Sequence, residues 1–239
     1  MNMANNKLLI AISTRDAKSD HVKELRAHLE SSVGTAPHTI EIRTNNGEMG
    51  LSAFYNKILA DFPDYNRFVF MHDDITFSTY NWGQILNELF DKHPEFGVIG
   101  LAGSKTMLGD GHWWTTRTDL YGKVMHHDKT GKWMTAFCTQ EVELEEVAVC
   151  DGLFMAVDRS RTDVKFDEDF TRFHFYDVSF TFNNFLSGKS KNGVTTAIRI
   201  THDSVGAFNP DEYNPFRDLF VSKNTENLPV VNLQKAQHV

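Results

Sequence analysis

Cysteine is scarce in this sequence, and its spacing argues against two common kinds of site. The 239-residue chain has only Cys138 and Cys150, twelve positions apart, with no Cys-x-x-Cys pair. A disulfide framework needs several spaced cysteines, and a structural zinc site needs closely spaced ligand pairs. We therefore expect reduced thiols, and neither a disulfide scaffold nor a cysteine-based zinc site.

Positive charge and long apolar segments are also lacking. The formal net charge is −8, and the densest basic stretch, residues 189–191, has only two lysines. Nucleic-acid backbones and anionic membranes are therefore not expected partners. No stretch approaches the ~20 apolar residues of a membrane span. The apolar run after Lys7 is too brief for a signal sequence. We expect a cytoplasmic protein with no transmembrane segment.

The composition is that of an ordinary globular protein, with 41% hydrophobic and 23% charged residues. Over residues 7–101, continuous apolar runs alternate with segments of helical periodicity. Strands are predicted at 7–14, 39–43, 68–71 and 97–101, and helices at 21–31, with Asp20 as its N-cap, 51–59 and 81–90. This order predicts an α/β fold in which helices cover both faces of a parallel sheet.

The second half of the chain is less regular. Residues 102–146 have no clean period, although 129–132 could form the turn of a hairpin. The segment 147–157 is strand-like and is interrupted at Asp151-Gly152, residues 176–186 are helical up to Gly188, and 194–200 form a β-branched strand. From residue 207 onward the chain reads as a polar tail.

A cluster of polar residues ends the apolar run that begins at Phe68. His72, Asp73 and Asp74 follow it directly, and all three are potential metal ligands. In open α/β sheets, ligands bind just beyond the carboxyl ends of the strands. The cluster therefore suggests a divalent cation, with a phosphate beside it. Taken alone, these residues are equally well explained as caps of a turn and the next helix.

The order of these motifs resembles that of a GT-A fold glycosyltransferase, similar to the family 2-like bacterial enzymes. The matching features are the acidic cluster at 72–74, Asp151-Gly152, Phe175-Tyr176-Asp177 and His202 after a strand. The resemblance covers about residues 7–206. It implies a Rossmann-like three-layer αβα sandwich with a mostly parallel central sheet. One domain over 1–206 would have a nucleotide-binding half (7–101) and an acceptor half (102–206), followed by a tail (207–239).

The resemblance also implies a metal site. In that family an Asp-x-Asp motif holds Mn²⁺ or Mg²⁺ against the donor diphosphate. His72 stands here in place of the first Asp, and Asp74 in place of the second. His202 falls where such enzymes place a third ligand. We therefore expect Asp74 and His202 to bind the metal, and His72 and Asp73 to contact the donor. The alternative for His202 alone is a turn residue bonded to the backbone.

Asp177 matches the family's catalytic base, an acid at a helix start that deprotonates the acceptor hydroxyl. An inverting transfer needs one such base, opposite the leaving group. The alternative is an ordinary helix N-cap. A second acid often follows two residues later in the family, but this chain has Ser179 there.

Further residues match the family's donor pocket. Family counterparts of Ser13, Thr14 and Arg15 contact the nucleoside, Asn45 could bond a base edge, and Ser52 and Asn56 share a helix face near the nucleotide. Asp151 and Gly152 match the floor of the sugar site, and Trp113 and Trp114 could stack on a sugar. Turn chemistry explains Ser13, Thr14 and Asn45 almost as well, and a packed loop explains the tryptophans.

The sequence thus favours a metal-dependent, inverting, hexosyltransferase-like enzyme. It would move a sugar from a nucleotide-diphosphate donor, with UDP-sugars the first expectation, to the hydroxyl of a glycan or another acceptor. A nucleotidyltransferase is disfavoured because no Gly-rich Lys/Arg loop is present. A non-catalytic nucleotide- or glycan-binding module on the same fold stays open, because fold alone does not establish activity.

Overall fold

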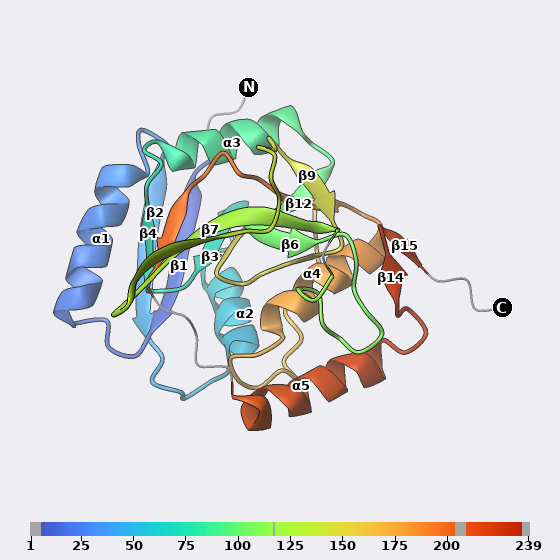
Figure 1. The fold of residues 1–239 in the computed structure, drawn as a ribbon. Coiled ribbons are helices and arrows are strands. Elements are labelled where there is room, and N and C mark those ends of the chain that lie inside the picture. Colours follow the sequence, from blue (N-terminus) through green and yellow to red (C-terminus); the bar gives the residue numbers. More distant parts are fainter. Residues whose placement is uncertain (1–5, 117, 204–208, 236–239) are drawn as a thin grey trace.

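The first hundred residues follow the predicted alternation of strand and helix, except that an unpredicted short strand, β4 (Ile75–Phe77), comes directly after β3 (Arg67–Met71) (Figure 1). The structure is a computed structural model that describes residues 6–116, 118–203 and 209–235. The elements of this part are β1 (Leu8–Thr14), α1 (Asp20–Ser32), β2 (His38–Thr44), α2 (Leu51–Asp61), β3 (Arg67–Met71), β4 (Ile75–Phe77), α3 (Trp82–Lys92) and β5 (Phe96–Gly100). Ser19, not Asp20, caps α1, because its side chain accepts a hydrogen bond from the Val22 N–H.

The remaining elements come from the half in which the sequence shows less periodicity. They are β6 (Ala102–Ser104), β7 (Leu120–Asp128), β8 (Gly131–Ala136), β9 (Glu145–Val147), β10 (Val149–Cys150), β11 (Phe154–Asp158), α4 (Tyr176–Ser187), β12 (Lys191–Val194), β13 (Ile200–His202), α5 (Pro210–Lys223), β14 (Val230–Val231) and β15 (Gln234–Lys235). The predicted hairpin at 129–132 is confirmed as the β7–β8 turn. Gly188 ends α4 in the left-handed conformation, as expected.

The central sheet has seven strands in the order β2-β1-β3-β11-β5-β12-β9. The pairs β1–β2, β1–β3 and β5–β12 are parallel, whereas β11 is antiparallel to both of its neighbours and β9 is antiparallel to β12. The sheet is therefore mixed, which corrects the expectation of a mostly parallel one. All five residues of β11 are buried, so its composition matches that of a parallel core strand and does not reveal its direction.

Helices cover both faces of this sheet, which gives the predicted three-layer arrangement. Alternate residues of β1 belong to different cores. Leu8, Ile10 and Ile12 pack in the cluster that includes Leu25 of α1 and residues of α3. Leu9 and Ala11 pack in the cluster formed with α2 and part of α4. This alternation follows from the two-residue period of a strand.

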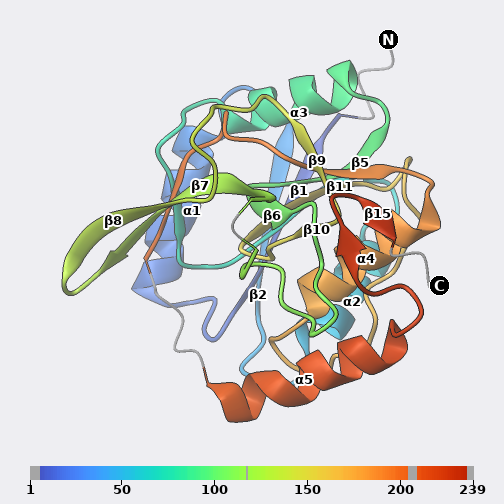
Figure 2. The ribbon, with the colours of Figure 1, turned by 45° about the vertical axis from the view of Figure 1, so that its right-hand side comes forward.

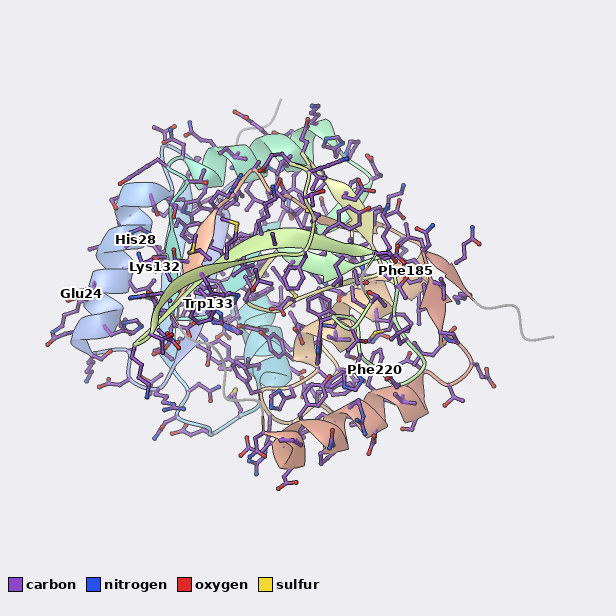
Figure 3. The ribbon with its side chains drawn as sticks, viewed as in Figure 1. Glu24, His28, Lys132, Trp133, Phe185 and Phe220 are labelled. Carbon is purple, nitrogen blue, oxygen red and sulfur yellow. The ribbon has the colours of Figure 1, made fainter. Side chains whose placement is uncertain are left out.

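A second, smaller sheet has the order β10-β6-β7-β13-β4, and β8 pairs with β7. The strand predicted at 194–200 is divided between the two sheets: β12 ends at Val194 in the central sheet, and β13 begins at Ile200 in the small one. The β7–β8 hairpin extends beyond the rest of the small sheet (Figure 2). Trp133 of β8 lies on this hairpin (Figure 3) and stacks on His126 of β7.

The prediction of a polar tail is wrong for the described residues from 209 onward. Asn209 caps helix α5, and Phe220 of that helix is fully buried. Its ring centroid lies 5.4 Å from that of Phe182 on α4. Figure 3 labels Phe220 beside helix α5. Val230 of β14 pairs with Met107. The segment thus completes the core; the boundary predicted at residue 206 lies outside the described residues.

Candidate metal and nucleotide site

A cleft of about 1110 Å³ opens at the carboxyl ends of β1, β2 and β3. The polar residues that the sequence places after these strands meet there, because parallel neighbours end at the same edge of the sheet. The predicted residues that line it are Ser13, Thr14, Arg15, Asn45, His72, Asp73 and Asp74. The loop before α4 closes the cleft with residues 171–174, and Glu212 of α5 also lines it.

Two histidines and one carboxylate converge beside this cleft. One ligand atom of each of His72, Asp74 and His202 lies within 4.8 Å of the other two, a spacing that suits a shared cation. His202 Nε2 is 3.2 Å from Asp74 Oδ1. The two sheets create the arrangement. His72 directly follows β3, which ends at Met71 in the central sheet, and the antiparallel pairing of β4 with β13 sets His202 opposite Ile75, next to Asp74.

The protonation of the two imidazoles differs because their surroundings differ. Burial lowers the pKa of His72, and this outweighs the attraction of the Asp74 charge. Burial also acts on His202, but its hydrogen bond to Asp74 and the charge of that carboxylate outweigh burial and raise the pKa of His202. His72 is therefore neutral at pH 7, which is the form of imidazole that binds a metal.

Asp73 is directed away from the three-residue cluster. Its Oδ2 accepts a hydrogen bond from the Thr14 hydroxyl at 2.5 Å, which ties the end of β3 to the end of β1. Its main-chain oxygen lies 2.6 Å from His21 Nε2. The predicted contact of Asp73 with a ligand would thus be made through the Thr14–Asp73 pair, on the floor of the cleft.

Asp177 lies in the first turn of α4, but it does not cap the helix. Phe175 occupies the cap position in the left-handed conformation. Asp177 Oδ2 instead accepts a hydrogen bond from the Gly152 N–H at 2.7 Å. Burial, and then the negative charge of Asp151, raise the pKa of Asp177 to about 7. A carboxylate with such a pKa accepts protons near neutral pH, as a general base must.

Tyr176 is a site residue that the sequence analysis missed. Its side chain is 1% exposed, and its hydroxyl donates a hydrogen bond to the Gly152 carbonyl at 3.0 Å. Burial raises its pKa well above the usual range, so the hydroxyl keeps its proton. His72 Nε2 lies 3.0 Å from the same hydroxyl. The only sequence signal was its position directly before Asp177.

Two exposed arginines add positive charge to the cleft. Arg15 follows β1, and Arg172 belongs to the loop before α4. Within the described residues neither guanidinium has an ion-pair partner, whereas Arg43, Arg67 and Arg199 are all paired. The Asn45 amide donates hydrogen bonds to the Ser13 hydroxyl and to the Met49 carbonyl, which holds the loop after β2 in place.

The other predicted residues do not line the cleft: Asp151, Gly152, Asp177, His202, Ser52, Asn56, Trp113 and Trp114. Ser52 is fully buried in α2. The Asn56 amide bonds the Phe166 backbone and Glu168. Trp113 is only 3% exposed and packs in the core, whereas Trp114 is partly exposed. We do not carry Ser52, Asn56 or Trp113 into the proposed site.

A model of a glycosyltransferase-like family matches residues 8–220. No curated protein gives a significant match. Among solved structures, GalNAc-T7 with UDP, GalNAc and Mn²⁺ superposes with a TM-score of 0.51 at 8% identity, over 85% of this chain and 44% of that one. A197 from STIV superposes with a TM-score of 0.48 at 12% identity, over 83% and 86%. The chain thus spans less than half of the GalNAc-T7 chain.

Proposed function

The chain belongs to the glycosyltransferase-like family, and from this premise we propose that it moves a sugar from a nucleotide-diphosphate donor to an acceptor hydroxyl. The observation that carries the proposal is the cluster of His72, Asp74 and His202 beside the cleft. The chain has the GT-A fold, in which ligands bind at this edge of the sheet. The proposed acceptor is a glycan or another hydroxyl compound.

The three side chains fit a divalent cation of intermediate hardness. Their ligand atoms are two imidazole nitrogens and one carboxylate oxygen. Mg²⁺ is bound almost exclusively by oxygen ligands, whereas first-row transition-metal ions also accept imidazole, and a solved protein of this fold was crystallised with Mn²⁺. We therefore propose Mn²⁺ in preference to Mg²⁺. When bound, the cation would offset the negative charge that develops on the diphosphate leaving group.

The cleft supplies the remaining contacts for the donor. Arg15 and Arg172 would bind phosphate oxygens, because their guanidinium groups are unpaired among the described residues and line the cleft. Ser13, Thr14 and Asn45 would contact the nucleoside at the ends of β1 and β2. UDP is the first nucleotide to test, since a solved protein of this fold was crystallised with UDP and Mn²⁺.

Asp177 is the proposed base. Its carboxylate accepts a hydrogen bond from the Gly152 N–H, and a remaining lone pair could take the proton of the acceptor hydroxyl. A pKa of about 7 suits this task at neutral pH. Ser179 has no carboxylate and cannot serve as a second acid, so we propose an inverting transfer in which Asp177 is the single base. Asp151, which raises the Asp177 pKa, would hold a sugar hydroxyl.

The test is a donor screen. UDP release would be measured for UDP-glucose, UDP-galactose and their N-acetylated forms, with Mn²⁺ or with EDTA, for the wild type and Asp74→Ala. Asp203→Ala is the matched control, because its carboxylate pairs with His127 outside the cluster. We expect Mn²⁺-dependent release from at least one donor, lost in Asp74→Ala only. Metal-promoted UDP binding without turnover would instead identify a non-catalytic module.

In the part of the chain that the structure describes, no helix combines the length and apolarity needed to cross a membrane. Cytoplasmic location, family 2 membership and hexosyl transfer stay predictions.

A further inference from the structure

One glycine connects the proposed metal site to the proposed base. The Gly152 N–H donates to Asp177 Oδ2 at 2.7 Å, and the Gly152 carbonyl accepts from the Tyr176 hydroxyl at 3.0 Å. His72 Nε2 lies 3.0 Å from that hydroxyl. The hydrogen bonds therefore run from His72 through Tyr176 and Gly152 to Asp177, across the start of α4 and the turn before β11.

The direction of these hydrogen bonds fixes the tautomer of His72. A phenol has one proton to donate, and a carbonyl oxygen can only accept. Because Tyr176 gives its proton to Gly152, its oxygen must accept from His72, so the imidazole proton lies on Nε2. Nδ1 then keeps its lone pair and is the only ring nitrogen able to bind a cation.

We propose that Tyr176 is a positioning residue, which holds His72 as the Nε2–H tautomer and orients it for metal binding through Nδ1. This inference rests on the proposed metal site. Metal-binding histidines usually donate their second N–H to a fixed acceptor, which sets the ring orientation and the tautomer. Here the acceptor is the buried phenol oxygen of Tyr176, and the phenol donates its own proton to the Gly152 carbonyl.

Packing explains why a glycine stands at position 152. A Cβ built there would lie 2.2 Å from the Tyr176 hydroxyl oxygen and 2.7 Å from Asp177 Cβ. Any side chain would therefore push both residues away from the main chain that they bond. The family resemblance places Gly152 at the floor of the sugar site; in the structure this glycine permits the close approach of two neighbouring side chains.

The direct test is Mn²⁺ binding, with the metal alone as probe, followed by electron paramagnetic resonance. Tyr176→Phe keeps the ring and removes the acceptor of the His72 proton. We expect its Mn²⁺ affinity to fall by about 10- to 100-fold. Tyr55→Phe is the matched control: this residue is also 1% exposed, and its ring centroid is 5.7 Å from that of Tyr176, but no hydrogen bond joins it to His72 among the described residues. Its affinity should stay at the wild-type value.

Two further measurements separate positioning from a general packing effect. Long-range ¹H–¹⁵N spectra of ¹⁵N-histidine protein report the tautomer directly. We expect Nε2–H for His72 in the metal-free wild type and a mixture in Tyr176→Phe. In a double-mutant cycle, Tyr176→Phe should cause no further loss of affinity in a His72→Ala background, because Tyr176 acts through His72.

The outcomes distinguish this inference from the proposed function. If wild type and Tyr176→Phe bind Mn²⁺ within three-fold of each other, or if His72 carries its proton on Nδ1, the positioning role is rejected and the metal site stands. If the wild type binds no Mn²⁺, the metal site is rejected and the inference with it. An equal loss in Tyr55→Phe would assign the effect to packing and reject the role.

Discussion

His202 Nε2 lies 3.2 Å from Asp74 Oδ1, which joins the end of β13 to the turn before β4. The main-chain bond from the Asp203 N–H to the Asp74 carbonyl, 2.8 Å long, holds the same two segments together. Replacing the Asp74 side chain should therefore remove a ligand without separating the strands. The contribution of this junction to folding and its proposed role in metal binding can therefore be tested independently.

Asp74→Ala should abolish the stabilisation that Mn²⁺ adds to UDP binding. A ligand raises the apparent stability in proportion to the logarithm of its concentration over its Kd. Thermal unfolding would be followed with UDP alone and with UDP plus Mn²⁺. We expect an Mn²⁺-dependent rise in Tm for the wild type and for Asp203→Ala, and none for Asp74→Ala. An undiminished rise in Asp74→Ala would show that the metal is held elsewhere.

Arg172→Ala should weaken UDP binding by about ten-fold, the scale of one charge-assisted hydrogen bond. Arg172 lines the cleft and, within the described residues, forms no ion pair, so its loss should not disturb other charges. Isothermal titration with UDP would measure the change. Arg217→Ala is the control, since that guanidinium pairs with Asp218 on α5. Equal affinities for Arg172→Ala and wild type would exclude Arg172 from the phosphate site.

Phe220→Ala should lower the free energy of unfolding by about 3–5 kcal/mol, the usual cost of emptying a buried phenylalanine site. Phe220 is fully buried between α5 and α4. Urea unfolding would measure the loss. Val231→Ala, at a residue that is 52% exposed, is the control and should change stability by less than about 1 kcal/mol. A small effect of Phe220→Ala would show that helix α5 contributes little to the stability of the fold, as expected of a tail.

The sequence predicted those elements whose apolar pattern is strong. Strands β1 and β3 and helix α4 lie within a few residues of their expected positions. The direction of β11 could not be predicted, because a strand buried on both faces has the same composition in either orientation. Helix α5 was missed because it contains Pro215 and its buried residues are only Tyr213 and Phe220.

The candidate site was predictable where it depends on the ends of strands. His72, Asp73 and Asp74 follow a strand directly, so their place at the sheet edge needed no knowledge of tertiary contacts. The partnership of His72 with Tyr176 joins residues 104 positions apart, and no local pattern encodes it. Ser52 and Asn56 were misplaced for a related reason: their helix was predicted, but not which of its faces meets the cleft.

Asp177→Asn should lower the rate of sugar transfer by roughly 10²-fold or more, the scale of a lost general base. Asparagine keeps an oxygen to accept the Gly152 N–H, so donor affinity should stay near the wild-type value. Initial rates and UDP titrations would separate the two effects. Asp64→Asn, at an exposed acid, is the control. Transfer within a few-fold of wild type would move the role of base to Asp151.

The same carboxylate should make both activity and stability depend on pH. Burial, followed by the charge of Asp151, raises the pKa of Asp177 to about 7 in the folded protein, while in the unfolded chain it is about 3.9. Transfer should therefore rise with pH through a single titration near 7, as the base loses its proton.

When the pH lies between those two pKa values, Asp177 is protonated in the folded protein and ionised in the unfolded chain. The contribution of Asp177 to stability is thus fully present below about pH 4 and is lost as the pH rises to about 7. The amide of the Asp177→Asn variant does not titrate, so this variant should gain stability relative to the wild type over that window. The gain is at most about 4 kcal/mol, and partial exposure of the carboxylate reduces it. Urea unfolding of both proteins, and of Asp64→Asn, at about pH 4.5, 6 and 7.5 would measure it. A difference between wild type and Asp177→Asn that is the same at all three pH values would show that Asp177 titrates like an ordinary surface carboxylate and is not tuned as a base.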